Sequence, residues 1–198
     1  MPKLLIATSN QGKIREYHLL LDGLGYKITT LAEEGITKVV TESRNSYEQN
    51  ARLKAVTYAK LSRLLTLADD SGLEVDALNG EPGIKSARFA GKAATDAERV
   101  SLLLARLKGV PWERRMARFR CVIAIATPKG QTETCYGECR GMIALEAKGE
   151  NGFGYDPVFF LPEINKTMAE LPLEAKNQIS HRARASQKAR QVLQQLHI

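Results

Sequence analysis

The stretch 64-LLTLADDSG-72 decides how this sequence folds and where its chemistry lies. Its mainly apolar half, 64–68, predicts a buried strand that ends at the adjacent carboxylates of Asp69 and Asp70. Carboxylates at a strand end commonly hold Mg²⁺, because this hard cation prefers oxygen ligands and offsets the repulsion between two acids. The stretch therefore favours metal-assisted chemistry on phosphate. The alternative is that the pair only caps a turn with Ser71 and Gly72.

Composition sets the class of protein and of partner. The 198 residues suffice for one substantial core or two packed lobes, and we expect a single domain over 1–198. A net charge of +7 favours anionic partners such as nucleotides, phosphosugars or nucleic acid. A basic nucleic-acid-binding module is the alternative from a different class. We expect no nucleic-acid partner, because no recognised motif accompanies the charge and the acids would repel a polyanion.

The termini and cysteines bear on the compartment. The apolar start, 1–7, is too short for a secretory signal, and no later run is long enough to span a membrane, so we expect a soluble cytoplasmic protein without membrane partners. The odd number of cysteines argues against a disulfide framework. No zinc site is expected, because Cys135 and Cys139 lack a nearby second pair of ligands.

Alternating apolar and polar patterns predict a mixed α/β domain. Thr95 and Glu98 have the spacing of a capping box at the start of one helix. Residues 128–130 predict a turn between two long strands. The predicted strands are 3–7, 27–31, 64–69, 115–127 and 132–143, and the predicted helices begin at 14, 47, 95 and 180, the last three ending at 65, 108 and 196.

Three further motifs carry candidate chemistry. The loop 8–13 could bind phosphate through its backbone N–H groups at a helix start, although it lacks the Walker A pattern and could be an ordinary capped turn. Glu42 precedes the long helix, on which Asn50 and Lys54 share one face. The glycines of 150–157 would let Phe153 and Tyr155 stack on a base, or the loop is a tight turn with both rings in the core.

Taken in order, these motifs closely resemble the inosine triphosphate pyrophosphatase family over essentially the whole chain. The blocks that carry the resemblance are Thr8-Ser9-Asn10 with Lys13, 68-ADDSGL-73, 82-PGI-84 through 86-SAR-88, 152-GFGYDP-157, and Lys176 with 180-SHR-182. The resemblance implies an elongated two-lobed α/β fold, a mixed sheet flanked by helices, with the active-site cleft between the lobes. It also implies a homodimer that uses Mg²⁺ to hydrolyse ITP, dITP and XTP to the monophosphate and pyrophosphate.

The resemblance assigns roles by motif position. It makes Asp70 the catalytic carboxylate and a metal ligand, Glu42 a second metal ligand, and Asp69 a supporting acid. Triphosphate contacts are implied for Thr8, Ser9, Asn10, Gln11, Gly12, Lys13 and Lys176. Nucleotide and base contacts are implied for Ser71, Phe153, Gly154, Tyr155, Asp156, His181 and Arg182.

One position departs from the family pattern. The long helix of the family usually begins with Glu-Asn-Ala, whereas this chain has Gln49-Asn50-Ala51. Glu48 is adjacent, but one residue turns a helix by about 100°, so its side chain is expected to face elsewhere. The metal site would then hold less negative charge. A related pyrophosphatase acting on modified pyrimidine or methylated guanine nucleotides is the closest enzyme alternative.

Overall fold

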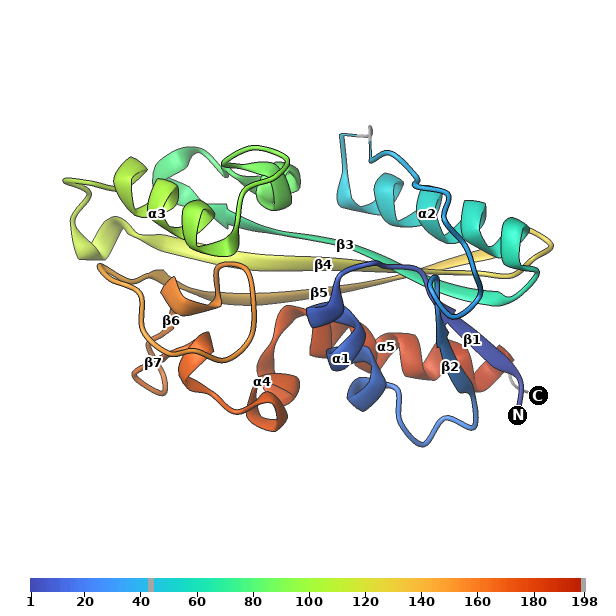
Figure 1. The fold of residues 1–198 in the computed structure, drawn as a ribbon. Helices are drawn as coiled ribbons and strands as arrows, with labels where there is room; N and C mark the ends of the chain where they lie inside the picture. The colour runs from blue at the N-terminus through green and yellow to red at the C-terminus, as the bar shows by residue number, and fades with distance from the viewer. Residues whose placement is uncertain (43–44, 197–198) are drawn as a thin grey trace. The chain divides into compact units, whose positions relative to one another are not determined.

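The computed structural model describes residues 1–42 and 45–196. Over these residues the strands form one mixed sheet in the order β2-β1-β3-β4-β5-β6-β7, with β1 parallel to β2 and β3, and β6 antiparallel to β5 and β7. The strands are β1 Lys3–Ile6, β2 Lys27–Thr30, β3 Leu65–Val75, β4 Met116–Ala126, β5 Thr132–Ile143, β6 Phe159–Leu161 and β7 Lys166–Thr167. The α-helices are α1 Gln11–Leu20, α2 Tyr47–Ser62, α3 Asp96–Arg106, α4 Leu173–Ile179 and α5 His181–Leu196 (Figure 1).

The chain divides into two compact units. Unit 1 comprises Met1–Asp70, Cys121–Gly137 and Arg182–Ile198, and unit 2 comprises Ser71–Arg120 and Glu138–His181. Two of the boundaries fall inside motifs that the sequence singled out, between Asp70 and Ser71 and between His181 and Arg182. The cleft between lobes that the resemblance implies stays a prediction.

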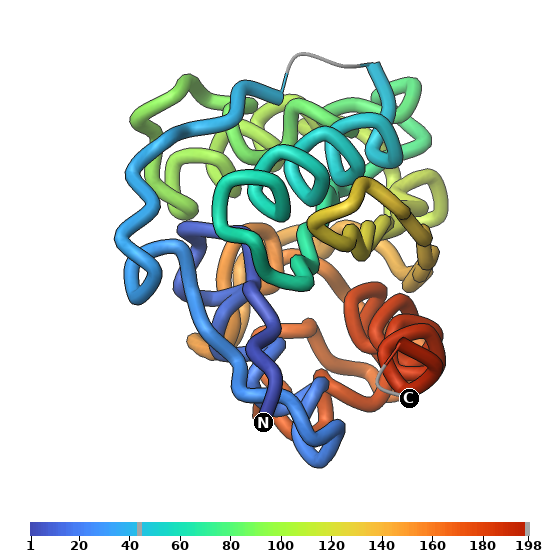
Figure 2. The backbone as a smooth tube through the Cα atoms, turned by 90° about the vertical axis from the view of Figure 1, so that its right-hand side faces the viewer, coloured from blue at the N-terminus to red at the C-terminus, as the bar shows by residue number. Residues whose placement is uncertain are grey.

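Unit 1 packs helices on both faces of its strands. Leu4 and Ile6 of β1 share a buried cluster with Tyr17 of α1 and with Ala185 and Leu193 of α5. Helix α2 lies on the opposite side of the strands from α5 in both views (Figures 1 and 2). Because alternate strand residues point to opposite faces, this arrangement gives neighbouring residues of β3 different surroundings.

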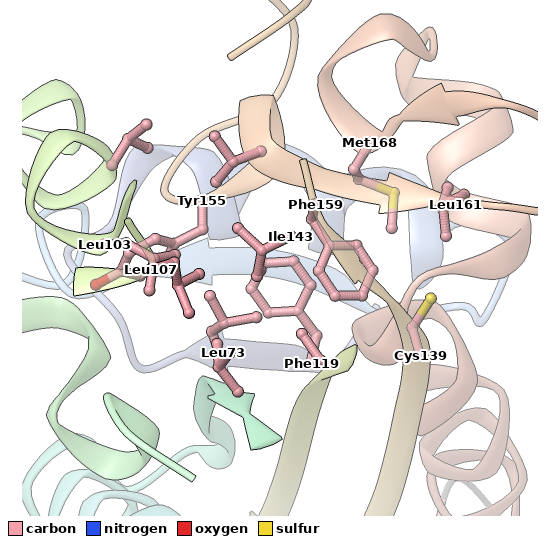
Figure 3. Packing of buried hydrophobic residues seen from close by; sticks show 14 of the residues in the cluster. Leu73, Leu103, Leu107, Phe119, Cys139, Ile143, Tyr155, Phe159, Leu161 and Met168 are labelled. Atoms are coloured by element: carbon pink, nitrogen blue, oxygen red, sulfur yellow. The ribbon is translucent and has the colours of Figure 1, made fainter. Parts of the chain in front are cut away.

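Unit 2 has its own hydrophobic core. Leu103 of α3 and Leu107, which follows that helix, pack with Leu73 of β3 and Phe119 of β4, with Phe159 beside them (Figure 3). The rings of Phe119 and Phe159 lie 4.4 Å apart between centroids. This core supports the loop 152–156, which supplies Tyr155 to the same cluster.

Most expected elements are confirmed, and the differences have local causes. The expectation that the strand ends at the aspartates was wrong: β3 continues to Val75, because the buried residues Leu73 and Val75 extend its apolar pattern. The turn alternative for Asp69 and Asp70 is excluded with it. Helix α2 ends at Ser62 rather than 65, because Arg63 takes a left-handed conformation with φ 60°.

Two further comparisons complete the fold. Helix α4 was not predicted, and it occupies the segment between β7 and α5. The capping box at Thr95 and Glu98 is confirmed, with both of its hydrogen bonds present. Within residues 1–42 and 45–196, no helix is both long and apolar enough to cross a membrane.

Candidate active site

Strand β3 carries the two aspartates into different environments. Asp69 and Asp70 are both buried, with 1% and 4% of their surface exposed. Since successive residues of a strand point to opposite faces, Asp69 meets groups from α1 and α5, whereas Asp70 meets α2. Two adjacent carboxylates can therefore have different chemical properties.

Asp69 lies in a buried network of charges. Lys13 Nζ donates to Asp69 Oδ1 at 3.0 Å, and Arg182 Nη2 and Nε donate to Oδ2 at 3.2 and 3.3 Å. Arg182 Nη1 also donates to Glu16 Oε2 at 2.7 Å. Burial alone would raise the pKa of Asp69, but the Lys13 and Arg182 cations hold it well below its usual range. Asp69 is therefore ionised and bonded to its partners, and its role as a supporting acid stays a prediction.

Asp70 has the opposite tendency. Asn50 Nδ2 donates to Asp70 Oδ2 at 2.9 Å. Burial raises the pKa of Asp70 above its ordinary value, Lys54 offsets part of the shift, and the Glu42 carboxylate adds to it. A carboxylate with raised proton affinity is suited to accept a proton from water.

Lys54 connects the carboxylates of unit 1. Its Nζ forms a short ion pair with Glu42 and donates to the backbone oxygen of Asp69 at 2.5 Å. Burial alone would lower the pKa of Lys54, but Glu42, Asp69 and Asp70 raise it, so the ammonium group stays charged. The four-residue spacing of Asn50 and Lys54 on α2 was the sequence signal for this contact.

Glu48 and Gln49 lie near the start of α2, and Glu48 has partners other than the groups around Asp69 and Asp70. Glu48 accepts a hydrogen bond from Tyr136 at 2.7 Å and pairs with Arg52, and Gln49 is exposed. The expectation that Glu48 faces elsewhere is confirmed. Its side chain bonds Tyr136 and Arg52 instead.

The first loop is a capped helix start. Asn10 Oδ1 accepts a hydrogen bond from Lys13 N at 3.1 Å, and Thr8 Oγ1 accepts one from Asn10 N at 3.2 Å. Ser9 and Gln11 are exposed, whereas Gly12 is buried. The loop is thus a capped turn, which by itself does not decide between the two interpretations. Phosphate binding by 8–13 stays a prediction, which the helix N-terminus favours.

Unit 2 holds a second group of predicted residues around Asp156. Its Oδ2 accepts hydrogen bonds from Phe153 N at 3.0 Å and from Lys176 Nζ at 2.5 Å. The Lys176 ammonium also lies 4.7 Å from the centroid of the Phe153 ring. A Cβ at Gly152 would lie 2.1 Å from Asp156 Oδ2, so this close approach requires glycine. Gly154 N donates to Asp96 Oδ2 at 2.7 Å.

Two predicted nucleotide contacts are part of the core of unit 2. The Tyr155 hydroxyl donates to the Ser86 carbonyl at 2.7 Å, and burial raises the pKa of Tyr155 above its ordinary value. The His181 ring stacks on Phe119 with centroids 4.6 Å apart. Ser71 is half-buried on β3. Nucleotide contacts by these three residues stay predictions.

The predicted residues thus form two groups, one in each unit. The group in unit 1 contains 8–13, Glu42, Asp70 and Arg182. The group in unit 2 contains Ser71, 153–156, Lys176 and His181. All three guanidinium nitrogens of Arg182 donate to the carboxylates of Glu16 and Asp69. The base contact implied for Arg182 also stays a prediction.

Sequence reasoning did not assign a role to Glu16. Its three-residue spacing from Lys13 on α1 is the one local signal that both side chains belong to the same network.

Comparison with known proteins covers nearly the whole chain. The profile of the Ham1 family matches residues 4–192. The chain belongs to the Ham1 family. Two relatives of this Ham1 family member are named dITP/XTP pyrophosphatase. The one from Desulforamulus reducens is 51% identical, over 99% of this chain and 98% of its own, and the one from Bacillus subtilis is 44% identical, over 98% of each.

Solved Ham1 structures have the same fold. A HAM1 protein from Coxiella burnetii is 40% identical and gives a TM-score of 0.88 over 98% of this chain and 100% of that chain. A nucleoside-triphosphatase / dITP/XTP pyrophosphatase from Mycobacterium abscessus is 41% identical, with a TM-score of 0.75 over 94% and 98%. The expected α/β fold, a mixed sheet flanked by helices, is confirmed for this Ham1 family member.

Proposed function

We propose that this Ham1 family member hydrolyses the non-standard purine nucleotides dITP, ITP and XTP to the monophosphate and pyrophosphate. Membership of the family and the names of its relatives support the reaction class. The observation that carries the proposal is the difference between the two neighbouring aspartates of β3. Lys13 and Arg182 hold Asp69 ionised, whereas burial raises the pKa of Asp70.

Mg²⁺ is part of the proposal, and the donor set fits it. Mg²⁺ usually takes one or two protein carboxylates and completes its shell with waters and substrate phosphates. Within residues 1–42 and 45–196 no group of three or more His, Cys, Asp or Glu side chains could hold a metal. The Glu42 carboxylate is close enough to Asp70 to raise the pKa of Asp70. A bound cation would offset this repulsion between the two carboxylates. These two residues would hold the ion, which when bound would neutralise phosphate charge and polarise the reacting phosphoryl group.

The residues of unit 1 would act on the triphosphate. The N–H groups at the start of α1 and the Lys13 ammonium would bind phosphate oxygens. Asp70 would accept a proton from the water that attacks the α-phosphorus, while the bond from that phosphorus to the bridging oxygen breaks and pyrophosphate leaves. Asn50 would orient the Asp70 carboxylate through its 2.9 Å hydrogen bond.

Residues at the start of α5 and in the loop 153–156 would select the base. Hypoxanthine and xanthine present a carbonyl oxygen at C6, whereas adenine presents an amine. A donor built for that carbonyl, from His181 or Arg182, would be left unpaired by adenine, and such sites can discriminate by roughly 10⁴. The Phe153 ring, with Lys176 held beside it, would provide a stacking surface.

The test is pyrophosphate release from ITP, dITP, XTP, ATP, GTP, dUTP and CTP, each with Mg²⁺ and with EDTA. We expect Mg²⁺-dependent release from the first three. Comparable turnover of ATP and ITP would overturn the base-selection proposal, and preference for dUTP or CTP would assign the chain to the pyrimidine alternative.

A matched pair of variants tests the proposed base. Asp70→Asn should lower kcat by about 10²–10⁴-fold with an unchanged Tm. Asp76→Asn, at an exposed aspartate further along the chain, should change neither. Substantial turnover by Asp70→Asn would remove its proposed role. A cytoplasmic homodimer belongs to the same proposal, and light scattering on the purified chain tests the dimer.

A further inference from the structure

Three residues of α2 lie at four-residue spacing, and the first two contact groups around the acids of unit 1. Asn50 donates to Asp70, and Lys54 bonds Glu42 and the Asp69 carbonyl. Tyr58 is the third, and residues four apart on a helix lie on one face. Neither the catalytic proposal nor the family resemblance gives Tyr58 a role.

The Tyr58 hydroxyl binds the segment that carries Glu42. It donates to the Lys38 carbonyl at 2.9 Å and accepts from Val40 N–H at 3.3 Å. The one hydroxyl thus donates one hydrogen bond and accepts another, and its two backbone partners are two residues apart. The ring of Tyr58 is only 5% exposed, so the anchor itself is fixed in unit 1.

The segment 37–42 lies largely on the surface. It forms no helix or strand, and its residues 37–39 and 41 are exposed, with Val39 83% exposed. An exposed stretch without regular structure buries little apolar surface, so its position depends on specific hydrogen bonds. Tyr58 supplies two of these at Lys38 and Val40, and Lys54 bonds the segment at Glu42.

We infer that Tyr58 is a positioning residue for Glu42, acting through the backbone of 38–40. The inference rests on the proposed role of Glu42 as a metal ligand. Mg²⁺ demands near-ideal octahedral geometry and tolerates displaced ligands poorly. Losing the hydroxyl should leave the fold intact, because the freed groups of Lys38 and Val40 lie in an exposed segment where water can replace it.

The test compares Tyr58→Phe with Tyr26→Phe. Both variants remove a hydroxyl that donates to a backbone carbonyl at 2.9 Å, but Tyr26 bonds Leu193 of α5. The first readout is amide hydrogen exchange in metal-free protein. We expect faster exchange over 37–42 in Tyr58→Phe alone, with the strands of unit 1 unchanged.

The second readout is the Mg²⁺ concentration that gives half-maximal pyrophosphate release from dITP. Loss of a group that orients a metal ligand typically weakens metal binding by about 10–100-fold, so Tyr58→Phe should raise this concentration by about tenfold. The kcat at saturating Mg²⁺ should stay within about twofold of the parent. Tyr26→Phe should change neither quantity.

Glu42→Gln separates the two levels of the argument. If Glu42→Gln raises the Mg²⁺ requirement and Tyr58→Phe does not, the positioning role is overturned and the proposed function stands. Unchanged exchange over 37–42 in Tyr58→Phe also overturns it. If Glu42→Gln itself leaves the Mg²⁺ requirement unchanged, the proposed metal ligand fails, and the inference fails with it.

Discussion

Replacing Arg182 with methionine should destabilise the protein strongly. The guanidinium lies 2.7 Å from Glu16 Oε2 and 3.2 Å from Asp69 Oδ2, and the three side chains are only 1–2% exposed. Removing one partner of a buried ion pair typically costs about 3–5 kcal/mol, because a charge is left uncompensated. Asp69 keeps Lys13 at 3.0 Å, so we expect a loss within this range rather than twice it.

Urea unfolding followed by circular dichroism measures this loss. For a chain of this size, a loss of about 3–5 kcal/mol corresponds to a fall in Tm of about 6–20 °C. The control is Arg184→Met, at an exposed position of the same helix, which should stay within about 0.5 kcal/mol of the parent.

A double variant tests the cause of the loss. The variant that combines Glu16→Gln with Arg182→Met should be more stable than Arg182→Met alone. The reason is that a neutral amide then replaces the Glu16 carboxylate, which would otherwise be buried without its cation. The reasoning is refuted if Arg182→Met costs less than about 1 kcal/mol, or if the two single losses simply add in the double variant.

Two other predictions concern close packing. Gly152→Ala should raise the KM for dITP at least about tenfold. The added Cβ would lie 2.1 Å from Asp156 Oδ2, so this oxygen would have to move and lose a charge-assisted hydrogen bond, which is worth about 1.5–3 kcal/mol. Gly109→Ala, with a similar positive φ but no atom within 4 Å, is the control, and equal KM values would contradict the close approach. The three buried cysteines should react with a thiol reagent at pH 8 only after unfolding, since burial raises the pKa of Cys121 to about 12. Rapid reaction of the native protein would contradict this prediction.

Features set by near neighbours could be predicted from the sequence. The capping box at Thr95 and Glu98 depends on residues three apart, and the structure has both of its hydrogen bonds. The face shared by Asn50 and Lys54 follows from helix periodicity alone. The end of α2 was missed because no composition rule places an arginine in the left-handed conformation that Arg63 adopts.

Features set by distant residues could not be predicted in the same way. Arg182 is 166 residues from Glu16 and 113 from Asp69, and its sequence context shows only a basic helix start. Its burial follows from the packing of α5 against α1 and β3. A local pattern of charges cannot distinguish an exposed arginine from one that compensates two buried carboxylates.

The division of the chain into units has a consequence for biosynthesis. Unit 1 includes the segment that begins at Arg182, so it cannot be completed before that segment is translated. At about 5–20 residues per second, the ribosome takes about 6–23 s to translate the 113 residues from Asp69 to Arg182, and during that time Asp69 lacks its arginine. Unit 2 ends at His181 and can assemble first. A nascent chain truncated before position 182 should therefore contain all of unit 2 but an unfinished unit 1, whose buried carboxylates Glu16 and Asp69 still lack Arg182.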